Sequence, residues 1–223
     1  MPKTRDFGLK SDIKRLICLP IVFGNLCIFA AQIHSNMSNK PQVTLAPLEP
    51  DDKEQFILDN QEAFKYGATQ EFGMRDDHYE EDGEIISRDT IEQSINHGEA
   101  YRILLDGEKV GGVVVSIDTA FRCGELELLF VKPGVHSKGI GYEAWCQIEK
   151  LYPKIIIWET VTPYFEKRNI HFYVNRLGFH IVEFWNKYQH GPAMPDDIDE
   201  NWSEEDEMFL FRKIINNSNT EKK

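Results

Sequence analysis

The sequence predicts a mixed α/β (α+β) domain built on one central, mostly antiparallel sheet with flanking helices. Two β-rich runs joined at Asp106-Gly107 form a hairpin, a single strand–helix–strand unit follows, and two more strands end the domain. Hairpins with one crossover are typical of a mixed sheet and not of a repeating β-α array.

The first half of the domain alternates strands with amphipathic helices. We expect a strand at residues 42–48, helices at 49–67 and 90–98, a hairpin at 100–118 and a strand at 124–131. Short acidic side chains accept hydrogen bonds from the first amides of a helix. Asp51 or Asp52 is therefore the expected N-cap of the first helix, and Asp89 that of the second.

The second half contains the crossover. We expect a helix from residue 140 to Pro153, a buried strand at 154–160, a helix at 165–178 and strands at 179–186 and 207–214. Residues spaced by three or four share one face of a helix. The apolar face of the first of these helices comprises Ile140, Ala144, Trp145, Ile148 and Leu151.

Composition excludes some functions. The chain of 223 residues has a formal net charge of −12, whereas nucleic-acid partners are bound by clustered Lys and Arg. Four cysteines show neither a C-x-x-C pair nor zinc-type spacing, so we expect no metal and reduced thiols in the cytoplasm.

The N-terminus differs from the rest of the chain. Residues 1–36 carry a net charge of +3, and an apolar run at 16–33 is interrupted by Pro20 and Gly24. This segment reads as a signal peptide, a membrane anchor or an extension upstream of a true start at Met37. We expect one domain at residues 42–213, followed by a polar tail at 214–223.

A glycine-spaced turn between strand and helix is how proteins bind phosphates. Residues 129–145, LFVKPGVHSKGIGYEAW, have this form. Ile140 and Gly141 occupy the Lys and Ser/Thr places of a P-loop and exclude it. The glycine turn of a dinucleotide-binding fold follows its strand directly, whereas here residues 132–138 lie between the strand and Gly139. The chain also has too few strand–helix–strand crossovers for that fold, so both observations weigh against a dinucleotide site.

Two motifs together resemble the GCN5-related N-acetyltransferase (GNAT) superfamily. HSKGIG, residues 136–141, resembles its pyrophosphate loop with His in place of the usual Gln or Arg, and NIHFYVNRLGF, residues 169–179, resembles its second landmark. The resemblance implies an acyl-CoA N-acyltransferase fold, with the sheet splayed where acetyl-CoA binds. The implied cofactor-binding residues are Phe130, Val131, His136, Ser137, Lys138, Gly139, Ile140, Gly141, Tyr142 and Asn169.

Acetyl transfer to an amine needs a proton acceptor and a proton donor. The resemblance points to Glu125 as the base. Alternate residues of a strand share a face, so Glu127 is an equal candidate for amine binding. Tyr173 matches the tyrosine that protonates the departing thiolate. It stands one residue further from Gly178 than the family pattern has it, and one residue turns a helical side chain by about 100°.

Charge suggests the acceptor. Residues 196–207 hold eight carboxylates and residues 75–84 form a second acidic stretch, so a small cationic amine is expected, acetylated directly in a ternary complex. Both stretches also fit solvated loops. The alternative function is a non-catalytic acyl-CoA-binding sensor, and a homodimer is compatible with the resemblance. A membrane partner is expected only if residues 1–36 are an anchor.

Overall fold

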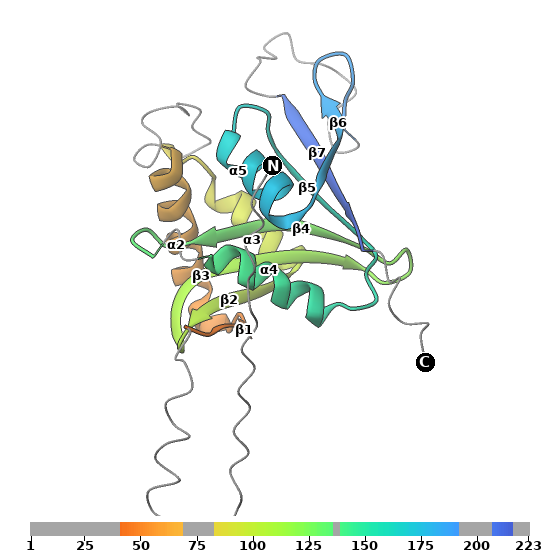
Figure 1. The fold of residues 1–223 in the computed structure, drawn as a ribbon. Helices are drawn as coiled ribbons and strands as arrows, with labels where there is room; N and C mark the ends of the chain where they lie inside the picture. The colour runs from red at the N-terminus through yellow and green to blue at the C-terminus, as the bar shows by residue number, and fades with distance from the viewer. Residues whose placement is uncertain (1–40, 69–82, 136–138, 192–206, 216–223) are drawn as a thin grey trace, which may run out of the picture. The chain divides into compact units, whose positions relative to one another are not determined.

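One sheet of seven strands, in the order β1-β2-β3-β4-β5-β7-β6, organises the computed structural model of this protein (Figure 1). Neighbouring strands are antiparallel except β4 and β5, which are parallel, so the predicted mixed, mostly antiparallel sheet is confirmed. The strands are β1 (Val43–Pro47), β2 (Glu99–Leu105), β3 (Glu108–Asp118), β4 (Cys123–Val131), β5 (Ile157–Pro163), β6 (His180–Trp185) and β7 (Met208–Ile214).

The structure describes residues 41–68, 83–135, 139–191 and 207–215. These residues belong to one compact unit that begins at Pro41. The expectations for residues 1–36, for nearly all of the polar tail and for most of both acidic stretches fall outside the described residues.

Helices cover both faces of the sheet and create two cores. They are η2 (Pro50–Asp52), α2 (Lys53–Tyr66), α3 (Arg88–His97), α4 (Ile140–Leu151), α5 (Lys167–His171) and the π-helix η5 (Phe172–Leu177). The face under α2 and α3, here called the α2 face, buries Phe56, Ile57, Ile91, Leu128 and Phe130. The opposite or α4 face buries Ala144, Trp145, Trp158, Leu177 and Phe211. Among the described helices, none is long and apolar enough to cross a membrane.

Two local predictions are wrong. Ser87, and not Asp89, caps α3, because the Ser87 hydroxyl accepts a hydrogen bond from the Thr90 amide at 3.1 Å and Asp89 already lies in the first turn. Leu151 is 49% exposed, because α4 extends past the core at its last turn.

A buried ion-pair network fixes α2 over the sheet. The Arg102 guanidinium, 1% exposed, donates from Nε to Asp52 Oδ2 at 2.7 Å and from Nη1 to Asp59 Oδ2 at 2.8 Å. Lys132, the first residue after β4, contacts Asp59 Oδ1 at 3.0 Å, and the Phe56 ring lies 5.0 Å from the guanidinium carbon. Asp52 therefore binds β2 and forms no side-chain cap on α2.

Replacing Asp59 tests this network. Burial by itself would raise the Asp59 pKa, but hydrogen bonds from Gln55, Lys132 and Arg102 hold it below its usual value. Asp59→Ala leaves a buried guanidinium partly uncompensated, so we expect the free energy of unfolding to fall by about 3 kcal/mol in urea titrations. Exposed Glu62→Ala on the same helix should stay within about 0.5 kcal/mol. Equal effects of the two changes would show that the network does not stabilise the fold.

Candidate active site

The site begins where β4 and β5 part. The two strands pair only through Cys123–Ile157, Gly124–Trp158 and Glu125–Glu159. Beyond these pairs β4 stays with β3 and β5 continues along β7, so the two strands separate. We call the separated segments, residues 126–131 and 160–163, the splay.

One hydrogen bond closes the narrow end of the splay. The buried Thr160 hydroxyl donates to the Leu126 carbonyl at 2.8 Å, immediately beyond the last paired residues. A side chain at Gly124 would overlap the Trp158 ring, so position 124 faces the α4 core and the next residue, Glu125, faces the α2 side. Thr160 is two residues after Trp158 on β5 and therefore lies on the α4 face. The base of the splay therefore presents a different side chain to each side of the sheet.

The α4 helix begins beside the splay. Gly139 precedes it with φ 74°, a left-handed conformation that glycine adopts without strain. The amides of Ile140, Gly141 and Tyr142 form its first turn, where helix amides lack intrahelical acceptors. A Cβ on Gly141 would lie 3.2 Å from the Phe172 ring, so the glycine allows η5 to approach closely.

This helix start fits a pyrophosphate group. Helix N-termini combine free amides with the positive end of the helix dipole. Gly139, Ile140, Gly141 and Tyr142 from the predicted set are at this position. His136, Ser137 and Lys138 fall outside the described residues, so the predicted histidine contact stays a prediction.

The other predicted cofactor residues border the splay. Phe130 and Val131 end β4; the Phe130 ring packs on Phe56 at 5.1 Å on the α2 face, and Val131 packs against the α4 core. Asn169 is the third residue of α5, whose N-cap is Glu166, so capping is not its role. Its Nδ2 donates to Thr162 Oγ1 at 3.2 Å and thereby links α5 to the separated part of β5.

A π-helix contains the extra residue that precedes Gly178. In an α-helix, one additional residue between Tyr173 and Gly178 would rotate the Tyr173 side chain by about 100° about the helix axis. Residues 172–177 instead form η5, which ends at Gly178 with φ 79°. π-Helical turns arise by such insertions and are frequent at functional sites.

Tyr173 lies at the base of the splay on the α4 face. Its ring packs against Phe211 at 5.4 Å and Phe179 at 6.0 Å. Burial raises the pKa of its hydroxyl, the neighbouring Thr160 hydroxyl lowers it, and Glu166 raises it further; the net shift is upward. The Tyr173 hydroxyl is therefore protonated at neutral pH and can donate a hydrogen bond.

Three carboxylates lie around the base of the splay on β4 and β5. Partial burial of the Glu125 carboxylate, followed by repulsion from Glu127 and Glu159, raises the Glu125 pKa. Arg212 on β7 donates from Nε to Glu159 Oε1 at 2.6 Å. Glu159 was not among the predicted site residues, because only the register of β4 with β5 places it beside Glu125.

A bulge in β4 changes the surroundings of Glu127. Leu126 pairs with Val115 and Leu128 with Val114, so Glu127 is an extra residue opposite β3. Leu126 and Leu128 consequently enter different cores, and the strict alternation assumed for Glu125 and Glu127 is interrupted. The two carboxylates are nevertheless close enough for Glu127 to raise the Glu125 pKa.

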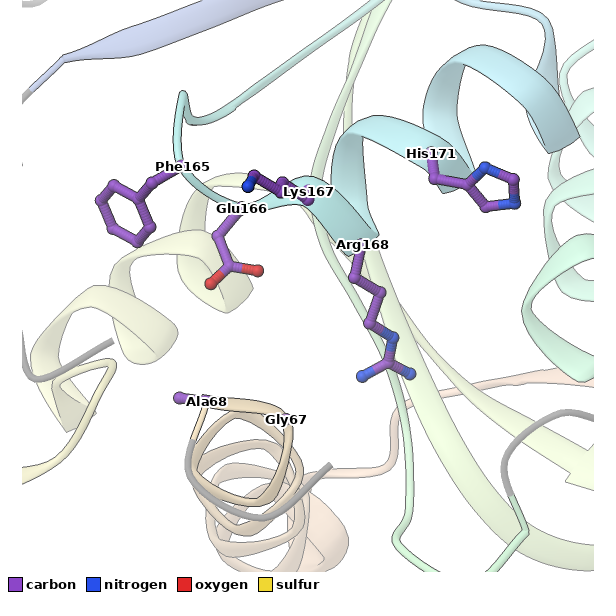
Figure 2. A pocket seen from close by; sticks show the side chains of 7 residues that line it. All are labelled: Gly67, Ala68, Phe165, Glu166, Lys167, Arg168 and His171. Atoms are coloured by element: carbon purple, nitrogen blue, oxygen red, sulfur yellow. The ribbon is translucent and has the colours of Figure 1, made fainter. Parts of the chain in front are cut away.

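A cavity of about 270 Å³ lies between the end of α2 and the start of α5 (Figure 2). Glu166 and Arg168 point toward the end of α2, and His171 points away from it (Figure 2). The lining residues are Gly67, Ala68, Phe165, Glu166, Lys167, Arg168 and His171. The described residues contain no group of three or more side chains suited to a metal ion.

Known proteins are similar to this chain in sequence and in fold. The Acetyltransferase (GNAT) family matches residues 59–179. The uncharacterized protein YrkN of Bacillus subtilis is 43% identical over 182 residues, covering 79% of this chain and 96% of that protein. The family match includes β4, the start of α4 and η5.

Solved acetyltransferases have the same fold. The ribosomal-protein-S18-alanine N-acetyltransferase of Escherichia coli superimposes with a TM-score of 0.54 at 12% identity, covering 82% of this chain and 99% of that one. A GNAT family acetyltransferase of Elizabethkingia anophelis with acetyl-CoA bound gives 0.51 at 20% identity, covering 78% and 98%. The family match covers more than half of the chain and the splayed sheet has the fold of these structures, so the chain belongs to the GNAT family of acetyltransferases.

Proposed function

We propose that this protein transfers the acetyl group of acetyl-CoA to a primary amine. One observation carries the proposal: a carboxylate and a tyrosine hydroxyl approach the base of the splay from opposite faces of the sheet. Glu125 ends the paired segment of β4 on the α2 face, and Tyr173 meets Thr160 on the α4 face. Amine acetylation needs both a proton acceptor and a proton donor.

The residues around the splay would bind the co-substrate. The first-turn amides of α4 and Gly139 would hold the pyrophosphate, together with His136, Ser137 and Lys138, which precede Gly139 in the sequence, and Asn169 would line the same side. The ends of β4 and β5 would flank the pantetheine arm. When bound, acetyl-CoA supplies an activated acyl group as a thioester.

The acceptor amine must lose a proton to attack. Glu125 would accept that proton, directly or through water, with Glu127 as the alternative base. Its raised pKa moves a glutamate toward the range in which it works as a general base near neutral pH. Glu159 is held by Arg212, which leaves Glu125 as the less compensated carboxylate of the pair.

The departing thiolate needs a donor. The Tyr173 hydroxyl keeps its proton at neutral pH because burial raises its pKa, so it would donate to the sulfur. Direct transfer in a ternary complex needs no further nucleophile. The acidic sequence and the carboxylates at the splay favour a small cationic acceptor.

A panel of amines tests the proposal. With acetyl-CoA and each amine at pH 7.5, we expect at least one primary amine to accelerate thiol release well beyond hydrolysis, with the acetylated amine detected by mass spectrometry. Acetyl-CoA binding without acceleration by any amine would favour the alternative function, a sensor that binds acyl-CoA without turnover.

Tyr173→Phe tests the proton donor. The change keeps the ring between Phe179 and Phe211 and removes only the hydroxyl, so kcat should fall by about 10²-fold with little change in the KM for acetyl-CoA. Tyr101→Phe removes a hydroxyl that binds Tyr152 on the same face, and it should leave kcat unchanged. Unchanged kcat in the Tyr173 variant would remove this residue from the mechanism.

The pH profile tests the base. Glu125 accepts a proton only when ionised, so kcat/KM should fall as the pH drops through its pKa, which is raised above the ordinary glutamate value. Glu159→Gln removes a repelling charge, which lowers the Glu125 pKa and shifts this acidic limb to lower pH. Glu125→Gln should abolish the limb and lower kcat/KM by about 10²-fold. A limb that persists in Glu125→Gln would assign the base elsewhere.

A further inference from the structure

Thr160 holds the base of the splay together with a single hydroxyl. Its side chain is 2% exposed, and its Oγ1 donates to the Leu126 carbonyl at 2.8 Å. Both residues come directly after the last β4–β5 pair, Glu125–Glu159. Thr160 is therefore the first β5 side chain on the α4 face at the point where the two strands separate.

The register of β5 with β7 places this hydroxyl next to Tyr173. Thr160 pairs with Phe211 of β7, and residues paired across antiparallel strands have Cβ atoms about 5 Å apart on one face of the sheet. The Tyr173 ring packs on Phe211, at 5.4 Å between ring centres. Thr160 and Tyr173 are therefore neighbours of the same phenylalanine on the α4 face, and they are close enough for the Thr160 hydroxyl to lower the Tyr173 pKa.

The Thr160 hydroxyl has one proton and donates it to one oxygen at a time. In the structure that oxygen is the Leu126 carbonyl. Rotation about the C–O bond redirects the proton without moving the rest of the side chain. A phenolate oxygen is a stronger acceptor than a carbonyl, because hydrogen bonds to a charged group are roughly twice as strong as those between neutral groups.

We propose that Thr160 is a positioning residue for acetyl transfer, and that its hydroxyl turns from the Leu126 carbonyl to the Tyr173 oxygen as Tyr173 protonates the departing thiolate. The inference rests on the proposed function. It gives the phenolate that forms on Tyr173 a hydrogen-bond donor that is already in place before the reaction begins.

The step balances in protons and in charge. The O–H bond of Tyr173 breaks, an S–H bond forms on coenzyme A, and the phenolate keeps the electron pair of the broken bond. Thr160 keeps its own proton throughout. The proton that Glu125 takes from the amine passes to water, and water returns a proton to Tyr173 before the next turnover.

Tyr173 needs such a donor because its surroundings oppose a negative charge. Burial and the Glu166 carboxylate both disfavour the phenolate, whereas the Thr160 hydroxyl favours it. A hydrogen bond that forms only as the phenolate develops stabilises the transition state and not the bound substrate. The loss of Thr160 should therefore lower the rate of the chemical step and leave the affinity for acetyl-CoA unchanged.

Thr160→Val tests this role, because valine has nearly the same shape and lacks the hydroxyl. The rate of thiol release is measured in single turnovers, with the primary amine of the panel that the wild type acetylates fastest. We expect this rate to fall about tenfold and the Kd for acetyl-CoA to stay within about twofold, since one hydrogen bond to a charged group is lost. Thr44→Val removes a half-buried threonine hydroxyl on β1, at an edge of the sheet, and should leave the rate unchanged.

The same change in Tyr173→Phe separates this role from a structural one. Without the Tyr173 hydroxyl no phenolate forms, so Thr160→Val should then alter the remaining rate by less than about twofold. A threonine that only supports the Leu126 carbonyl would lower the rate by the same factor with and without the tyrosine hydroxyl, and that result overturns the inference. Thr160→Ser keeps the donor and should retain most of the wild-type rate; a serine variant as slow as the valine variant also overturns it.

The remaining outcomes are distinct. Thr160→Ala is measured with and without Tyr173→Phe, so a valine variant that does not fold leaves the question decidable; melting temperatures show that each variant is folded. A wild type that acetylates an amine while Thr160→Val keeps the full rate overturns this inference and leaves the proposed function intact. A wild type that acetylates no amine of the panel overturns both.

Discussion

The site depends on one constraint, the end of pairing between β4 and β5 after three residue pairs. Each strand has a complete neighbour on its other side, β3 for β4 and β7 for β5, so the sheet remains stable while its middle opens. The Thr160 hydroxyl satisfies the Leu126 carbonyl at the branching point, where that carbonyl leaves the ladder. Beyond this point, the backbone groups of β4 and β5 that face each other can bind a ligand, and the β3–β4 and β5–β7 hydrogen bonds stay intact.

A rigid frame on each face holds the opening in place. On the α2 face, the Arg102 network joins the start of α2 to β2 and, through Lys132, to the end of β4. On the α4 face, aromatic packing joins η5 to β7 and α4 to β5. The two faces differ in chemistry because their frames differ: ionic groups and carboxylates gather on the first, and tyrosine and helix amides on the second.

The backbone geometry of η5 accommodates the spacing of Tyr173 to Gly178, which is one residue longer than the family pattern. Its spacing to Gly178 indicates a misplaced side chain if the segment is an α-helix. The π-helix holds the extra residue within the turn, so Tyr173 reaches Thr160 and Phe179 still enters the core. Insertions of this kind cost hydrogen-bond quality and are retained where a side chain must be aimed. The bulge at Glu127 acts in the same way on β4.

The sequence alone was sufficient for the order of strands and helices, the mixed sheet and the family, because periodicity and the two motifs are local patterns. The cap of α3 was mispredicted, since Ser87 and Asp89 compete for that role and the hydrogen bond from the Thr90 amide goes to Ser87. Asp52 is the N-cap residue of α2 as predicted, but its side chain binds Arg102 and not a helix amide. Glu159 was not predicted to belong to the site, because only the register of β4 with β5 places it there. The charge balance at Glu125 arises only when distant segments meet, and no local pattern encodes that contact.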